Sequence, residues 1–313
     1  MDNTLDALEE QRITLQGLLD AKKTQADRNR LGQFATPTAL ALDILSYART
    51  LLPSCAGVRF LDPAFGTGAF YFAARKVFQE NQLKEALGFE IDSHYGTPAA
   101  SLWNDDSLRL QLTDFTREEP SARFNLIICN PPYVRHHHLE NLEKCRLQSR
   151  VLNASAMRLS GLAGLYCYFM GLSHAWMSSN CIAGWLIPSE FMDVNYGEGV
   201  KRYLLNQVTL LRIHRFDPND VQFADALVSS AIVWFRNAPP PRDHSVTFTF
   251  GGSILDPKVS RSVSSKALAC EAKWTRFPEL DTRSGQAVPT LSCFFHIKRG
   301  IATGCNDYFI LEK

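Results

Sequence analysis

The fold is decided by the stretch VRFLDPAFGTGAF, which runs from Val58 to Phe70. Its first four residues are mostly apolar and predict a short buried strand. Gly66 and Gly68 allow a tight turn and a close approach of the backbone to a ligand, because neither carries a Cβ. Residues 70–77 then have helical composition. Strand, glycine loop and helix therefore follow one another in the order that a nucleotide-type site of an open α/β sheet requires.

The glycine loop lacks the marks of two common phosphate-binding loops. The dinucleotide fingerprint G-x-G-x-x-G needs a third glycine at position 71, which is Tyr71. The lysine of a phosphate-cradling P-loop is also missing. The loop therefore favours neither a pyrophosphate nor a triphosphate as ligand.

Three further predicted strands, residues 86–91, 110–113 and 124–129, also end in polar side chains. Asp62 follows the first strand, and Glu90, Asp114 and Asn130 stand at the ends of the other three. A carboxylate at the position of Glu90 typically accepts hydrogen bonds from ribose hydroxyls. Asp114 offers an acceptor for an adenine amine, and the ring of the next residue, Phe115, offers a surface for the base. Ligands of open α/β sheets bind at these strand ends.

The fourth of these strands runs into Asn130-Pro131-Pro132-Tyr133. The side-chain oxygen of Asn130 and the backbone oxygen of Pro131 can accept both protons of an exocyclic NH2 group. The two prolines fix φ and so stiffen that carbonyl, while Tyr133 offers a stacking face. The alternative interpretation is a proline-rich turn with a surface tyrosine. The first interpretation predicts a planar amine as substrate.

The order of these motifs resembles that of the S-adenosylmethionine-dependent N6-adenine DNA methyltransferases, and in particular their gamma (TaqI-type) class. In that class an element like Thr36-Pro37 precedes the glycine loop, and the sequence-reading domain follows the catalytic motifs. The resemblance covers the chain from about Gly32 to its end. It implies an α/β fold: a Rossmann-like, doubly wound, mostly parallel seven-stranded methyltransferase sheet with helices on both faces.

The resemblance also implies a reaction, in which a methyl group passes from S-adenosylmethionine to the N6 amine of a flipped adenine in a specific sequence of double-stranded DNA. The enzyme would be the modification enzyme of a restriction–modification system. The implied catalytic residues are Asn130, Pro131, Pro132, Tyr133 and Phe223, the last of which would press on the flipped base or simply anchor a loop to the core. The implied cofactor-binding residues are Thr36, Pro37, Asp62, Pro63, Ala64, Gly66, Gly68, Glu90, Ile91, Asp114, Phe115, Asn130 and Pro132.

The sequence divides into three expected parts. Residues 1–31 carry leucines between charges and predict an amphipathic helical extension, packed on the domain or on a partner. Residues 32–252 form the expected catalytic domain, in which Thr36 caps a helix that begins at Pro37 and residues 139–160 form a lid or a disordered stretch. Residues 253–313 are expected to be a linker and the incomplete beginning of a target-recognition domain, because 297–309 resemble its opening. We therefore expect a fragment or half of a split enzyme.

Composition adds constraints on environment and partners. The chain has 313 residues, a net charge of +1 and eight cysteines without a C-x-x-C pair, which favours a reducing cytoplasm. No apolar run is long enough to cross a membrane. No metal site is expected, because the adjacent side chains of His136, His137 and His138 cannot easily converge on one ion. The weak charge suits a catalytic half whose main grip on DNA lies elsewhere, on a separate recognition subunit or a cognate restriction endonuclease.

Three other functions remain open on sequence grounds. An RNA adenine methyltransferase would use the same chemistry on another nucleic acid. A protein-glutamine methyltransferase would use the same Asn-Pro-Pro-Tyr motif, because a side-chain amide presents the same planar NH2 group. A non-catalytic cofactor-binding subunit of a larger restriction–modification complex would keep the cavity without turnover.

Overall fold

The computed structural model describes residues 2–79, 81–217, 229–278 and 293–296. The chain divides into two compact units, Met1–Pro278 and Glu279–Lys313, and the first of these contains the sheet and its helices. Phe223 and residues 297–309, for which the sequence analysis predicts roles, lie outside the described residues.

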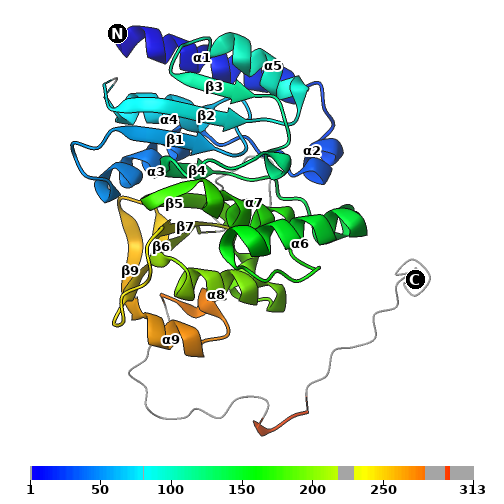
Figure 1. The fold of residues 1–313 in the computed structure, drawn as a ribbon, viewed down its shortest axis with the longest axis vertical. Helices are drawn as coiled ribbons and strands as arrows, with labels where there is room; N and C mark the ends of the chain where they lie inside the picture. The colour runs from blue at the N-terminus through cyan, green and yellow to red at the C-terminus, as the bar shows by residue number, and fades with distance from the viewer. Residues whose placement is uncertain (1, 80, 218–228, 279–292, 297–313) are drawn as a thin grey trace, which may run out of the picture. The chain divides into compact units, whose positions relative to one another are not determined.

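In the described part of the chain, nine strands form one sheet in the order β3-β2-β1-β4-β5-β7-β6-β8-β9 (Figure 1). β7 pairs antiparallel with β5 and β6, and β9 pairs antiparallel with β8, while every other pair is parallel. The strands are β1 (Val58–Asp62), β2 (Leu83–Phe89), β3 (Leu108–Gln111), β4 (Phe124–Cys129), β5 (Met177–Pro188), β6 (Thr209–Arg215), β7 (Ser230–Arg236), β8 (Ser245–Gly252) and β9 (Pro257–Ser264).

The predicted number of seven strands is wrong, because nine strands form the sheet among the described residues. The sheet is mixed, and five of its eight described strand pairs are parallel. The sequence analysis assigns residues 253–313 to a linker and the beginning of a target-recognition domain, and so does not predict β9. β9 is an edge strand, and all its residues except Val263 are at least partly exposed, so its sequence lacks a clear apolar alternation. The proposed boundary after residue 252 lies between β8 and β9, and the compact unit continues to Pro278.

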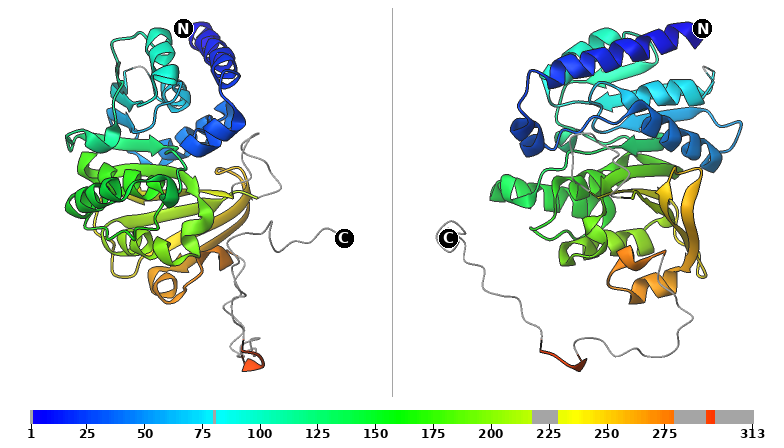
Figure 2. Two further views of the ribbon diagram at one scale, coloured as in Figure 1. Left: turned by 90° about the vertical axis from the view of Figure 1, so that its right-hand side faces the viewer. Right: turned by 180° about the vertical axis from the view of Figure 1, so that it is seen from behind.

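Helices cover both faces of the sheet, which confirms the α/β layering (Figure 2). α3 and α4 pack on one face, while α7 and α8 lie on the other with α6 packed on α7. α1 packs on α4 and α5. The helices are α1 (Asp2–Asp20), α2 (Gln25–Leu31), α3 (Thr38–Leu51), α4 (Ala69–Val77), α5 (Ser93–Leu102), α6 (Asn141–Ser155), α7 (Leu165–Ser173), α8 (Glu198–Asn206) and α9 (Ser265–Cys270). Within the described ranges, none of these has the length and apolar character that a membrane-spanning helix needs.

Two successive aromatic side chains of β7 pack against helices on opposite faces of the sheet. The ring of Trp234 packs against Tyr47 of α3, at 5.2 Å between centroids, and the ring of the next residue, Phe235, packs against Tyr203 of α8 at 5.7 Å. Successive side chains of a strand point to opposite faces, so these two rings anchor opposite layers. Trp234 lies over Gly184 of β5, where a larger residue would not fit.

Two local predictions are corrected. Residues 141–155 form the ordered helix α6, although we expected residues 139–160 to be a lid or a disordered stretch. α3 begins at Thr38 with Pro37 as its N-cap, so Thr36 does not cap the helix. The hydroxyl of Thr36 instead accepts a hydrogen bond from Asn130.

We predict opposite effects for alanine at two glycines of this fold. A Cβ at Gly184 would lie 2.5 Å from Trp234, so Gly184→Ala should lower the free energy of unfolding by about 1–3 kcal/mol through overpacking. Gly17, at an exposed position of helix α1, has no atom within 4 Å of an added Cβ, so Gly17→Ala should raise the free energy of unfolding by roughly 0.5–1 kcal/mol. Urea denaturation measures both changes. A Gly184→Ala variant as stable as the parent chain would contradict this packing.

Candidate functional site

A cavity of about 520 Å³ lies at the carboxyl ends of four adjacent strands. Its walls come from the segments that follow β1, β2, β3 and β4, together with residues 31–36. The volume lies in the range of cavities that hold a cofactor or a drug-sized ligand. The predicted site residues that line it are Thr36, Pro63, Ala64, Gly66, Glu90, Ile91, Asp114, Phe115, Asn130 and Pro132, while Pro37, Asp62, Gly68, Pro131 and Tyr133 are not among the lining residues.

The two glycines of the loop have different tasks. Both have positive φ, +58° at Gly66 and +93° at Gly68, a conformation that L side chains rarely adopt. A Cβ at Gly68 would lie 2.4 Å from Nε1 of Trp103, whereas a Cβ at Gly66 would meet no atom within 4 Å. Gly68 is thus needed for packing behind the loop, and Gly66 keeps the cavity side of the loop open.

Glu90 holds the loop in place from the neighbouring strand. Its Oε2 accepts a hydrogen bond from the backbone N–H of Gly66 at 2.9 Å, and its Oε1 accepts one from the N–H of Asp92 at 2.8 Å. Burial raises the pKa of the Glu90 carboxyl above its ordinary value. Each carboxylate oxygen retains further acceptor capacity, so Glu90 can still accept hydrogen bonds from ligand hydroxyls.

Asp62 supports the loop from beneath the cavity. It is 1% exposed, and its Oδ1 accepts a hydrogen bond from the N–H of Ala64 at 3.1 Å. Its Oδ2 has no hydrogen-bond partner in the described part of the chain. Burial, with a smaller contribution from the nearby Glu90 carboxylate, raises the pKa of Asp62 to about 8.

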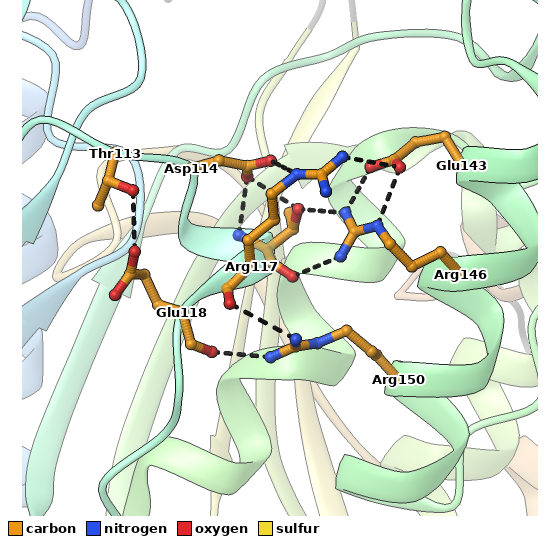
Figure 3. A network of polar contacts seen from close by, with 8 residues as sticks. Thr113, Asp114, Arg117, Glu118, Glu143, Arg146 and Arg150 are labelled. Atoms are coloured by element: carbon orange, nitrogen blue, oxygen red, sulfur yellow. Dashed lines mark hydrogen bonds and ion pairs between the residues drawn. The ribbon is translucent and has the colours of Figure 1, made fainter.

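Polar contacts anchor the segment after β3 to α6 (Figure 3). Oδ1 of Asp114 accepts hydrogen bonds from the backbone N–H and the hydroxyl of Thr116, at 2.9 and 2.8 Å. Arg146 of α6 donates to the carbonyl and hydroxyl oxygens of Thr116, at 2.9 and 2.8 Å, and also binds Glu143. Because Asp114, Thr116 and Glu143 line the cavity, α6 forms part of its wall.

Two large apolar side chains, Ile91 after β2 and Phe115 after β3, are among the residues that line the cavity. Phe115 packs against Phe89 and Phe169, at centroid distances of 5.4 and 5.3 Å, and is 3% exposed. Ile91 is 70% exposed, although it lines the cavity. Exposure of a large aliphatic side chain at a cavity wall favours a flat apolar ligand group there.

The amide of Asn130 has a defined orientation. Its Nδ2 donates hydrogen bonds to the backbone oxygen of Phe34 at 3.0 Å and to the hydroxyl of Thr36 at 3.2 Å. A carbonyl oxygen can only accept, so the nitrogen end of the amide must face Phe34. The buried Oδ1 of Asn130 has no hydrogen-bond partner among the described residues. A buried acceptor without a partner needs a hydrogen-bond donor, which a ligand or a water molecule in the cavity can supply.

Tyr133 is a buried residue that packs beside Phe34. Its hydroxyl donates a hydrogen bond to the backbone oxygen of Leu186 at 3.1 Å, and its ring lies 5.6 Å from the ring of Phe34. Phe34, and not Tyr133, is among the residues that line the cavity. The use of Tyr133 as a stacking face therefore stays a prediction.

Sequence reasoning missed one wall of the cavity, which α1 supplies through Arg12, Gln16 and Asp20. Their spacing of four residues places them on one side of a helix, a pattern that the sequence contains but that does not show what the helix packs against. With these residues included, the charged lining residues are Arg12, Asp20, Glu90, Asp92, Asp114 and Glu143. This predominantly acidic wall favours a cationic ligand over a polyanion such as a pyrophosphate.

In the described ranges, no group of three or more His, Cys, Asp or Glu side chains is placed to hold a metal ion. His136–His138 form a single turn of 3-10 helix after the Asn-Pro-Pro-Tyr segment. The expectation that the protein uses no metal stays a prediction.

The family model and the similar curated proteins both describe methyltransferases. The family model described as Eco57I restriction-modification methylase matches residues 71–222. The type II methyltransferase M.AccI of Acinetobacter calcoaceticus is 28% identical over 297 residues, which cover 90% of this chain and 53% of that protein. The chain is thus similar in sequence to type II restriction–modification methyltransferases. It spans about half the length of the curated relatives that it matches.

Solved structures agree on the fold. The type IIG restriction endonuclease BpuSI superposes with a TM-score of 0.61 at 15% identity, over 78% of this chain and 33% of that one. A Listeria monocytogenes protein assigned to the class I S-adenosylmethionine-dependent methyltransferases superposes with a TM-score of 0.63 at 17% identity, over 80% of this chain and 76% of that one. The fold is therefore an α/β methyltransferase-like fold, here with a mixed sheet.

We predict that the buried carboxyl of Asp62 makes stability depend on pH. Its pKa is raised from 3.8 to about 8, so the folded chain binds a proton that the unfolded chain releases, and stability falls as pH rises through this window. Asp62→Asn removes the effect and retains the oxygen that binds Ala64. The stability gain is the free energy of unfolding of Asp62→Asn minus that of the parent chain. This gain should be larger at pH 8 than at pH 5 by more than about 1 kcal/mol. Urea denaturation at pH 5 and pH 8 measures this gain. Asp106→Asn, at an exposed position, is the control. An equal gain of Asp62→Asn at the two pH values would contradict the prediction.

Proposed function

We propose that this chain transfers a methyl group from S-adenosylmethionine to the exocyclic N6 amine of a flipped adenine in DNA. The observation that carries the proposal is the buried, unpartnered Oδ1 of Asn130 at the cavity wall. This oxygen can only accept a hydrogen bond, and the NH2 group of an adenine can donate one to it. The relationship to type II methyltransferases supports DNA as the substrate, and the position of Thr36-Pro37 before the glycine loop supports the gamma class.

The cavity has the groups that S-adenosylmethionine requires. Its acidic lining suits a sulfonium cation, and the open space at Gly66 leaves room for a ligand beside the glycine loop. Glu90 would accept hydrogen bonds from the ribose, Asp114 from the adenine amine, and Ile91 and Phe115 would flank the adenine ring. Pro63, Ala64 and Thr36 would line the methionine part, and Pro132 would lie beside the reacting end, while Pro37, Asp62 and Gly68 support these residues from behind. When bound, the cofactor supplies an activated methyl group.

The residues of the chain then have to prepare the amine. Its nitrogen is a poor nucleophile, because its lone pair is delocalised into the purine ring. Hydrogen bonds from its two protons to Oδ1 of Asn130 and to the backbone oxygen of Pro131 would favour a pyramidal nitrogen and localise that lone pair. The hydrogen bonds of Asn130 to Phe34 and Thr36 would fix the position of this acceptor before the substrate binds. A dipole that is already oriented stabilises the transition state without the cost of reorganisation.

The target amine cannot be reached in a stacked duplex, so the adenine has to leave the helix. Phe34, Tyr133 and, outside the described residues, Phe223 are the aromatic side chains that we assign to the flipped base. We propose that the DNA sequence is read by surfaces other than this cavity. The partners we propose are double-stranded DNA and a cognate restriction endonuclease or a separate recognition subunit, in the cytoplasm.

We predict that Asn130→Ala lowers the rate of methylation much more than cofactor affinity. Loss of one preorganised acceptor should reduce the single-turnover rate by roughly 100-fold or more. The control is Asn125→Ala at the opposite end of β4, where the side chain binds Gly57 and Arg59 away from the cavity. Transfer of labelled methyl groups to DNA, with matched RNA as competitor, measures the rate. Methylation by Asn130→Ala at the rate of the control would refute the assignment.

Glu90→Ala should act mainly on cofactor binding. Loss of a charged acceptor for the ribose hydroxyls should weaken the affinity for S-adenosylmethionine by roughly 10- to 100-fold. Glu85→Ala is the matched control, because Glu85 lies in the same strand β2 and pairs with Arg123 far from the cavity. Isothermal titration calorimetry measures both dissociation constants, and equal values for the two variants would remove the ribose role from Glu90.

A further inference from the structure

Helix α1 presents one polar stripe to the cavity, formed by Arg12, Gln16 and Asp20. Hydrogen bonds connect this stripe to the glycine loop. Nη1 of Arg12 donates to the hydroxyl of Thr67 at 3.1 Å, and that hydroxyl donates to Oε1 of Gln16 at 2.7 Å. Nε2 of Gln16 donates in turn to Oδ1 of Asp20 at 2.9 Å. The N-terminal helix is therefore built into the wall of the candidate site.

Arg12 is held rigidly in this stripe. Its side chain is 3% exposed, and Nε and Nη2 donate to the two carboxylate oxygens of Glu9 at 2.7 and 2.6 Å. Nη2 also donates to the hydroxyl of Thr38 at 3.2 Å. With Thr67, these contacts use four of the five N–H groups of the guanidinium. The fifth, on Nη1, has no partner among the described residues.

The charges of the residues that line the cavity indicate which ligand group Arg12 could bind. It is the one lysine or arginine among the described residues that line the cavity, against five carboxylates. A ligand with positive groups is stabilised by those carboxylates, but a carboxylate on the same ligand would be repelled by them. S-adenosylmethionine carries a sulfonium, an ammonium and one carboxylate. Its carboxylate needs a donor at one place in this wall.

The position of Arg12 agrees with that requirement. Its partners Thr67 and Thr38 belong to the glycine loop and to the first turn of α3, directly after Thr36-Pro37. These are the elements to which we assign the methionine part of the cofactor. The groups assigned to the adenine, Asp114 and Phe115, follow a different strand, β3.

We propose that Arg12 binds the carboxylate of S-adenosylmethionine through the remaining N–H of Nη1. This inference rests on the proposed function, because it takes S-adenosylmethionine as the ligand. Glu9 acts as a positioning residue, since its two oxygens hold the guanidinium plane. Recognition of the amino-acid end of the cofactor then depends on the N-terminal helix, outside the motifs of the catalytic domain.

The test compares S-adenosylmethionine with its decarboxylated analogue, which keeps the adenosine, sulfonium and amine. The preference is the dissociation constant of the analogue divided by that of S-adenosylmethionine, measured by isothermal titration calorimetry on the full chain. Removal of Arg12 alone would leave the buried carboxylate of Glu9 without its ion-pair partner, so the variant is Glu9→Gln with Arg12→Met. Its matched control is Glu9→Gln alone, and thermal unfolding verifies that both fold.

We expect Glu9→Gln to keep the preference of the parent chain or increase it, because less of the guanidinium charge is neutralised. Addition of Arg12→Met should lower the preference by roughly 10-fold or more, since a charge-assisted hydrogen bond is lost for one ligand only. Arg12→Lys, which keeps a cation, should lower it less and carries the test if the double variant does not fold. A preference within about threefold of the control in every Arg12 variant would overturn the proposal.

The outcomes distinguish the role of Arg12 from the proposed function. If the parent chain binds neither ligand, S-adenosylmethionine is not the cofactor, and the proposed function fails with the role of Arg12. If it binds S-adenosylmethionine and both ligands weaken equally in the Arg12 variants, Arg12 only supports the fold of the wall. In that case the proposed function stands without the carboxylate site.

Discussion

The amide of Asn130 is fixed by a segment that lies almost a hundred residues earlier in the chain. Its nitrogen binds the backbone oxygen of Phe34 and the hydroxyl of Thr36, while its oxygen has no partner among the described residues. The same two segments also meet at Gly32, whose carbonyl accepts a hydrogen bond from the N–H of Tyr133 at 3.2 Å. A Cβ at Gly32 would lie 2.2 Å from that nitrogen, so only glycine allows this approach. The orientation of the Asn130 amide thus depends on close packing between residues 32–36 and 130–133.

Other parts of the cavity are coupled to this contact through the glycine loop. Thr67 binds Arg12 and Gln16 of α1 through its hydroxyl, and its carbonyl accepts a hydrogen bond from Nε1 of Trp103 at 2.8 Å. Glu90 binds the loop at Gly66. Segments from α1, β1, β2 and α5 therefore hold one loop in one conformation. Such a rigid wall lets the placement of a ligand follow from the fold, with little rearrangement on binding.

Much of the site could be predicted from sequence because its chemistry stands at strand ends. The apolar run 124–129 is observed as β4 with the same bounds, and the residues after β1, β2, β3 and β4 do meet at one cavity. These features depend on local patterns, namely short apolar runs followed by polar or glycine residues. The identity of the ligand, the roles of individual residues and the DNA sequence are not fixed by such patterns and stay predictions.

What sequence did not predict depends on contacts between distant segments. The helix α6 was not predicted, because charges such as Arg146 and Glu143 look solvated in the sequence, although Arg146 binds Thr116, 30 residues away. Thr36 was assigned to a helix cap, since the local pattern cannot show that Asn130 competes for its hydroxyl. Arg12 sits on a helix whose amphipathic pattern was recognised, but periodicity does not tell which loop a polar stripe will face. In each case the decisive contact is a hydrogen bond to a residue that is distant in the sequence.

The most direct measurement is a crystal structure of the chain with S-adenosylhomocysteine. We expect density for the ligand against the glycine loop, its ribose at Glu90 and its sulfur toward the oxygen of Asn130, with the amide nitrogen still bound to Phe34. A ligand bound elsewhere, or an Asn130 oxygen turned away from the sulfur, would contradict the proposed function.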